Sequence, residues 1–215
     1  MIPELSTNAT RIYRARIEIP DGDTYYITPI NWQATWRYET STYLSVTFFI
    51  PDEDMLDELT TVLGDSPSVL GESPTPMLGD SPISVVTLTI EVGARTGRDP
   101  ETDSYGDLLS VELETVRSDE GASSYSAQVS GHATYINDSP SEIVLGAGNY
   151  QSATLGVFRY RGPVNYAIKP GDRATIAGVS NPVVIGSISY NVNSNNATME
   201  IGELTDSTYL AELGW

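Results

Sequence analysis

The sequence has few residues of the kinds that carry chemistry. It contains one histidine, His132, and no cysteine, so thiolate metal sites, cysteine nucleophiles, disulfides and cysteine-held iron–sulfur clusters are excluded. The stretch VSGHATY places Ser130 two residues before His132 and raises the question of a serine–histidine pair. However, this stretch alternates like a strand, and the chain has no Gly-x-Ser-x-Gly turn. We therefore predict a structural, hydrogen-bonded histidine.

Carboxylates are the other candidates for chemistry. Asp99, Glu101 and Asp103 alternate as in a calcium loop, but the next glycine is Gly106 and the twelfth position holds Ser110. This departure favours a solvated hairpin tip. A hydrolase with an unrecognised acid pair remains an alternative, because 29 acidic residues bring some pairs together by chance. No motif marks an active site, and we expect no enzymatic activity, no metal and no cofactor.

The charge balance restricts the partners. There are 29 acidic and 11 basic residues, which gives a net charge of −18. Such a surface repels nucleic-acid phosphates and anionic lipids. The sequence also has no apolar run of membrane-spanning length and no basic-then-apolar leader. We expect a soluble chain without membrane insertion.

The basic residues fall into two groups, near the start and in the last third of the chain. They are Arg11, Arg14 and Arg16, and then Arg159, Arg161, Lys169 and Arg173. Two interpretations stay open: ordinary surface charge, or strips that dock on acidic faces of identical copies.

Alternation of apolar and polar residues dominates the chain and predicts strands. We expect strands over 11–20, 24–29, 31–38, 42–50, 84–94, 108–117, 125–135, 152–161, 173–178, 182–192 and 196–203, with 31–50 folded as a hairpin. One helix is predicted over 52–63, after Pro51 and with an apolar stripe that includes Met55 and Leu59. The predicted fold is mainly β: two small antiparallel β-barrel or sandwich domains, 1–138 and 139–215.

A threefold repeat follows the helix. Leu-Gly-acid-Ser-Pro occurs at Leu63–Pro67, Leu70–Pro74 and Leu78–Pro82. Its prolines remove ladder donors and its glycines prevent a lasting helix, which predicts an irregular arm over 63–82. The arm is either an expanded surface loop or a segment laid on a neighbouring subunit. In the second case the candidate contact residues are Val69, Leu70, Met77 and Leu78, together with Trp215 at the end of the chain.

Three segments resemble siphophage tail-tip proteins. They are ATWRYETSTYLSVTFFIPDED (34–54), VELETVRSDEGASSYSAQVSGHAT (111–134) and the stretch 157–203, which begins VFRYRGP and contains KPGD. Together they cover roughly half of the chain, in the order in which the family has them. The threefold arm is not a family pattern, and the iron–sulfur site of some tail hubs is excluded by the lack of cysteine.

The resemblance implies a structural protein of a phage tail end, a hub of small β-barrel domains in the baseplate or tail tip. It implies a symmetric ring, a trimer or hexamer, that joins the tail tube to host-recognition proteins. The partners would be other copies and other tail proteins, with DNA passing through an acidic lumen without specific binding. The location would be the virion, after synthesis in the host cytoplasm. The alternative class is a carbohydrate-binding or adhesin-like β-sandwich, because exposed Tyr and Trp stack on sugars.

Overall fold

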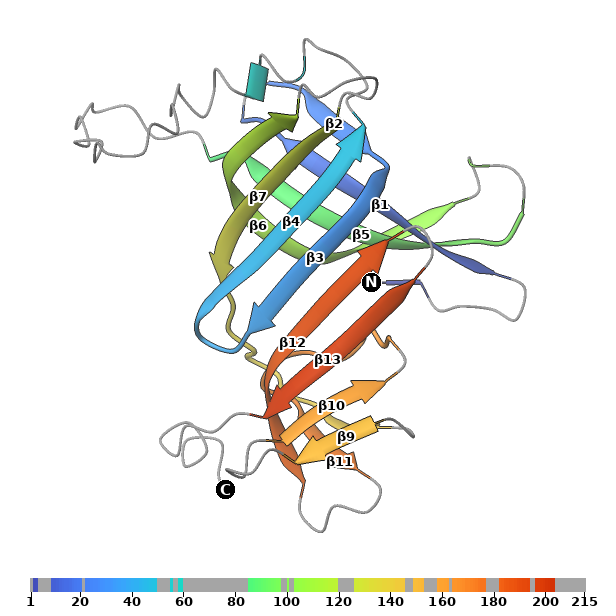
Figure 1. Ribbon diagram of the computed structural model, residues 1–215, viewed down its shortest axis with the longest axis vertical. Coiled ribbons are helices and arrows are strands. Elements are labelled where there is room, and N and C mark those ends of the chain that lie inside the picture. Colours follow the sequence, from blue (N-terminus) through green and yellow to red (C-terminus); the bar gives the residue numbers. More distant parts are fainter. Residues whose placement is uncertain are drawn as a thin grey trace, which may run out of the picture.

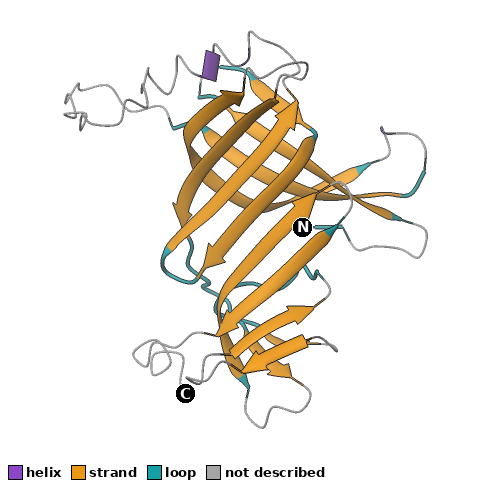
Figure 2. Cartoon of the chain, viewed as in Figure 1, coloured by secondary structure: helices purple, strands orange, loops and turns teal. Residues whose placement is uncertain are grey.

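The computed structural model describes residues 2–3, 9–20, 22–49, 55, 58–59, 85–97, 100, 103–119, 126–145, 149–152, 158–162, 164–176, 182–193 and 196–203. Nearly all secondary structure in this part of the chain is strand (Figure 2). The strands are β1 (Thr10–Glu18), β2 (Thr24–Ile27), β3 (Pro29–Arg37), β4 (Ser41–Phe49), β5 (Thr87–Arg95), β6 (Ser104–Asp119), β7 (Ser126–Thr134), β8 (Glu142–Leu145), β9 (Asn149–Ser152), β10 (Phe158–Gly162), β11 (Arg173–Ile176), β12 (Val183–Asn193) and β13 (Ala197–Glu203). The prediction of a mainly β protein is confirmed.

The strands form one open sheet in the order β2-β1-β5-β6-β7-β4-β3-β12-β13-β10-β9, with β11 and β8 attached to β12. All pairs are antiparallel except β8 with β11. Figure 1 shows β1 and β5 crossing behind β3 and β4, so this part of the sheet curls around its own core. Tyr13 on β1 meets Trp32 on β3 with ring centroids 5.7 Å apart. Aromatic packing therefore brings together two strands that are not paired.

Alternation in the sequence decides which face of each strand is buried. Ala15 and Ile17 of β1 are fully buried, as are Leu44, Val46 and Phe48 of β4. Arg16 and Thr47 between them face outward because successive side chains point to opposite sides of a strand. The predicted hairpin over 31–50 is β3 and β4, and Glu39 in its turn has a φ of 51°.

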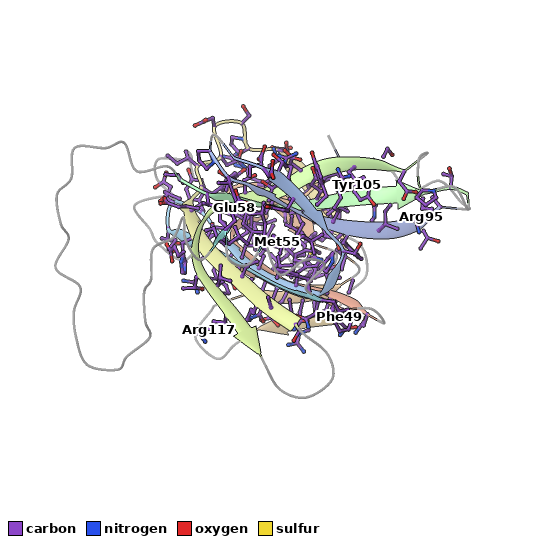
Figure 3. The ribbon with its side chains drawn as sticks, turned by 90° about the horizontal axis from the view of Figure 1, so that it is seen from above. Phe49, Met55, Glu58, Arg95, Tyr105 and Arg117 are labelled. Carbon is purple, nitrogen blue, oxygen red and sulfur yellow. The ribbon has the colours of Figure 1, made fainter. Side chains whose placement is uncertain are left out.

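The predicted helix over 52–63 lies mostly outside the described residues. Met55, Glu58 and Leu59 are described and are helical. Met55 and Leu59, two residues of the predicted apolar stripe, are 1% and 0% exposed. Seen from above in Figure 3, Met55 lies over the middle of the packed side chains, and Glu58 accepts a hydrogen bond from the Tyr25 hydroxyl. This helical turn covers one end of the core.

The sheet runs across the predicted domain boundary at 138/139. β3 pairs with β12 from Ser187 opposite Arg37 to Asn193 opposite Asn31, and buried residues on both sides of the boundary share one core. The carboxylate of Asp172, in the KPGD stretch, accepts hydrogen bonds from Ser141 N (2.8 Å), Lys169 N (2.8 Å) and the Asn137 side-chain amide (3.1 Å). The division into two domains stays a prediction.

None of the helical residues that the structure describes belongs to a helix long and apolar enough to cross a membrane.

Candidate functional site

The outer face of β3, β12 and β13 carries an open groove with a volume of about 520 Å³. Its floor is lined by side chains that are polar but uncharged: Gln33 and Thr35 of β3, Ser189 and Asn191 of β12, and Thr198 of β13. They point outward because the alternate residues Ala34, Tyr190 and Met199 point into the core. The groove volume lies within the range of ~300–1,000 Å³ that is usual for ligand sites.

Strand register sets the lining residues in rows. Thr35 lies opposite Tyr43 on one side and Ser189 on the other, and Ser189 lies opposite Glu200, which lies opposite Arg161. This row crosses five strands, β4-β3-β12-β13-β10, which are side by side in Figure 1. Four interstrand steps of ~4.8 Å make the row about 19 Å long.

A second row runs beside it, from Gln33 to Asn191 to Thr198. In the described part of the chain, the side chains of Gln33, Thr35, Ser189 and Asn191 have no hydrogen-bond partner, and Thr198 Oγ1 contacts only the Asn191 carbonyl oxygen, at 3.4 Å. The groove therefore presents free donors and acceptors of both amide and hydroxyl type.

The two ends of the groove differ. At one end the Tyr43 ring packs against His132, with centroids 5.1 Å apart, and His132 Nδ1 lies 2.7 Å from Glu114 Oε2. At the other end Arg161 Nε donates to Glu200 Oε2 at 2.8 Å. The groove thus has an aromatic end and an ion-paired end, and its net charge is small.

His132 is in β7, as a strand residue held by a hydrogen bond, which is what the sequence analysis expected of it. Its ring holds the tyrosine at the groove end. Among the described residues, no group of three or more His, Asp or Glu side chains is arranged to hold a metal ion.

Arg14 and Arg16, two of the arginines near the start of the chain, lie on the outer face of β1, away from the groove, and are paired with carboxylates of the same chain. Glu91, which is 3% exposed, accepts from Arg14 Nε at 2.6 Å and from Arg16 Nη1 at 2.8 Å. Arg16 also contacts Asp107 at 3.1 Å. Burial lowers the pKa of Arg16, but Asp107, Glu18 and Glu91 outweigh it, so the pKa is raised.

Aromatic rings cover the same cluster. The Arg14 guanidinium carbon lies 4.1 Å from the centroid of the Tyr105 ring and 4.4 Å from that of the Tyr26 ring. Both rings stabilise the guanidinium through cation–π contacts. Arg11, by contrast, lies on the same face of β1 as the inward residues Tyr13 and Ala15. Its guanidinium lies 5.6 Å from the centroid of the Tyr166 ring and donates to the Pro3 carbonyl oxygen at 2.8 Å. The outer face of β1 and β5 is therefore closed by internal contacts, whereas the groove is open.

The other residues singled out in the sequence are either paired within the chain or lie outside the described residues. Asp103 of the calcium-like stretch binds Arg95 (Nη2–Oδ2 2.5 Å), and this pairing lowers the pKa of Asp103. The loop is the connection between β5 and β6, the hairpin that was predicted. Val69, Leu70, Met77, Leu78 and Trp215 lie outside the described residues, and so does the side chain of Arg159.

The groove residues were not among the candidates predicted from the sequence. Their alternation with core residues is visible in the sequence and indicates that they face outward. The sequence does not indicate that β3 and β12 are neighbours, because the two strands pair across distant parts of the chain.

No protein-family model and no curated protein matches the sequence. Three solved structures are similar to the fold. The 43 kDa tail protein of prophage MuSo2 from Shewanella oneidensis has a TM-score of 0.49 and 7% identity, over 89% of this chain and 97% of that one. A tail protein from Neisseria meningitidis MC58 has a TM-score of 0.49 and 6% identity, over 91% and 97%.

The third is the E. coli c3393 protein, described as a component of the type VI secretion system with structural similarity to the T4 tail proteins gp27 and gp5. It has a TM-score of 0.44 and 6% identity, over 89% of this chain and 77% of that one. All three descriptions name tail proteins or a similarity to them, the class that the sequence resembles. At these scores the likeness is too remote to carry an argument about function.

Proposed function

We propose that the chain is a structural component of a bacteriophage tail end, of the hub type. One observation carries the proposal. The three segments that resemble tail-tip proteins contain β4 with the end of β3, β7 with the second half of β6, and β10 to β13. In the sheet the strands β6-β7-β4-β3-β12-β13-β10 are consecutive. Segments that are separate in the sequence thus build one continuous part of the sheet, as expected if they descend together from one folded unit.

In this proposal the chain forms a symmetric ring, a trimer or hexamer, between the tail tube and the host-recognition proteins. Closed rings are built from repeated heterologous contacts between identical copies. The net charge of −18 supports a lumen through which DNA passes without being held, because acidic walls repel phosphates. The chain would act without catalysis or metal, in the virion, after synthesis in the host cytoplasm and without inserting into a membrane.

The proposed contacts between copies come from the arm and the arginines. Val69, Leu70, Met77 and Leu78 each add apolar surface, worth about 1.5–3 kcal/mol when a side chain is fully buried. Arg11, Arg14, Arg16, Arg159 and Arg161, with Trp215, complete the proposed set. Arg14, Arg16 and Arg161 already pair with carboxylates of the same chain, so a neighbouring copy would meet ion pairs there and not free cations.

The mass of the particle in solution tests the ring. Native mass spectrometry and negative-stain electron microscopy of the chain, alone and co-expressed with the tail proteins encoded beside it, should give trimers, hexamers or larger rings. Antibodies against the chain should label one end of the tail in phage particles. A strict monomer in every mixture, or label on the capsid, would contradict the proposal.

Limited proteolysis tests the arm separately. Cleavage within 63–82 should be fast in the isolated chain and slow in the assembled tail. If both states are cut at the same rate, the arm takes no part in the contact, although the ring itself could still form.

A further inference from the structure

We infer that the groove on β3, β12 and β13 is a binding site for a neutral oligosaccharide. This goes beyond the proposed structural role and does not depend on it. The first support is the chemistry of the floor. Sugar hydroxyls both donate and accept hydrogen bonds, and the amides of Gln33 and Asn191 and the hydroxyls of Thr35 and Ser189 offer both functions.

The second support is that these side chains are unengaged, while three pairs of polar side chains elsewhere on the outer face bind one another. Thr89 and Ser110 are 2.8 Å apart, Thr115 and Ser130 are 2.6 Å apart, and the Gln128 amide donates to Ser45 at 2.9 Å. In these three pairs, side chains on adjacent strands satisfy each other. Within the groove, Gln33 and Asn191 are direct cross-strand neighbours, yet neither side chain has a partner among the described residues.

The third support is the aromatic ring at the end of the row. Tyr43 is held in place by His132, which Glu114 fixes in turn through a hydrogen bond of 2.7 Å. A ring fixed in this way loses little conformational freedom when a ligand packs on it. The C–H face of a pyranose packs on such a ring, and the tyrosine hydroxyl can hydrogen-bond to a hydroxyl at the edge of the sugar.

Charge selects a neutral ligand over an acidic one. The floor carries no charge, and the Arg161 guanidinium at the far end is paired with Glu200. The chain as a whole carries −18, which repels uronic acids and phosphorylated glycans. The row from Tyr43 to Arg161 is about 19 Å long, which suits a linear chain of several sugar rings and not a monosaccharide.

The buried tryptophans narrow the choice of aromatic platform. Trp32 and Trp36 are 1% and 4% exposed and lie in the core, so they cannot stack on a sugar. Tyr190 also lines the groove, but it is 2% exposed and belongs to the core. Tyr43 is therefore the accessible aromatic side chain among the described lining residues of the groove.

Saturation-transfer NMR and titration calorimetry on the full chain test the site. The probes are neutral oligosaccharides of glucose, mannose and N-acetylglucosamine, with an oligogalacturonate as the acidic control. We expect at least one neutral series to bind and the acidic one not to. Tyr43→Ala should weaken binding about tenfold or more, which is a loss of about 1.4 kcal/mol, whereas Tyr43→Phe keeps the ring and most of the affinity.

Single substitutions distinguish binding in the groove from binding elsewhere on the surface. Gln33→Ala and Asn191→Ala should each weaken binding, and both side chains are exposed, so folding should survive. Tyr26→Ala is the matched control, because Tyr26 is 57% exposed on β2, outside the groove, and its loss should leave binding unchanged. No binding by any neutral series, or binding that survives Tyr43→Ala and Asn191→Ala, would overturn the inference.

A different occupant would also overturn it. If hydrogen exchange at β3 and β12 slows as the protein concentration rises without sugar, a second copy covers the groove. Failure of sugar binding leaves the tail role untouched, because that role is tested by particle mass and antibody labelling.

Discussion

At the scale of single residues, Glu91 is the clearest case of a charge held by its surroundings. Its carboxylate is almost fully buried and accepts from two arginines of β1. Burying an ion pair adds little net stability, but removing one partner leaves the others uncompensated. We expect Glu91→Gln to lower the free energy of unfolding by about 2–3 kcal/mol, measured by urea denaturation.

Arg161→Gln is the matched control, because it breaks an ion pair in which the arginine is 75% exposed. Exposed pairs contribute ~0–1 kcal/mol, so this loss should be small. Equal losses in the two variants would mean that the Glu91 cluster behaves as ordinary surface charge.

Tyr135 provides a pH dependence at the same scale. Burial, helped by the charges of Asp172 and Asp138, raises its pKa to about 12. In the unfolded chain a tyrosine loses its proton near pH ~10. Between these values the unfolded state binds fewer protons than the folded state, so stability falls as pH rises. Burial raises the pKa of Tyr166 and Tyr190 as well, which acts in the same direction.

We therefore expect Tyr135→Phe to lose less stability than the natural chain between about pH 10 and pH 12. Urea midpoints across this range measure the difference, with midpoints near neutral pH as the reference. If both proteins lose the same stability with rising pH, Tyr135 ionises equally in the two states and the assigned shift is wrong.

At the scale of elements, a bulge explains why one glycine is required. The register of β6 and β7 shifts between Leu113 and Thr115, directly across from Gly131. A Cβ on Gly131 would lie 1.8 Å from the Glu112 carbonyl oxygen, which is backbone and cannot turn away. Bulges often place backbone this close, and glycine allows the approach.

Gly131→Ala should therefore cost about 2 kcal/mol or more, because the bulged strand has to move. Gly202→Ala on β13 is the control: the nearest atom to its Cβ is Ser187 Oγ at 2.6 Å, on a side chain that can rotate. We expect it to cost less than about 1 kcal/mol. Thermal unfolding measures both losses. If Gly131→Ala costs no more than Gly202→Ala, the close approach of the Glu112 carbonyl to Gly131 is wrong.

The elements also show what the sequence could and could not predict. Alternation predicted most of the strands and their buried faces, because period two is a local property: Leu88 and Ile90 are both fully buried, as the pattern requires. It did not predict β8 or most of β9, which are four residues long each. Glu91 alternates with Ile90 and Val92 and is therefore an outward position in the same pattern. Its burial depends on Arg14 and Arg16, which only strand pairing brings across from β1. The groove likewise depends on β3 pairing with β12. Such ladders between distant segments leave no local signal.

At the scale of the whole molecule, two features tie the predicted domains together. The β3–β12 ladder joins them as one sheet, and Asp172 binds Asn137 and Ser141 near the predicted boundary. This arrangement predicts that the chain unfolds as one cooperative unit.

Differential scanning calorimetry should show a single transition whose calorimetric and van't Hoff enthalpies agree. Asp172→Ala removes a buried acceptor of three hydrogen bonds and leaves their donors unpaired, so it should destabilise by about 3 kcal/mol. The single transition should move to lower temperature without splitting. Asp138→Ala, at an exposed neighbouring carboxylate, should leave the midpoint nearly unchanged. Two resolved transitions in the natural chain would show that the halves fold independently despite their shared sheet. Unfolding of only one half in Asp172→Ala would show the same.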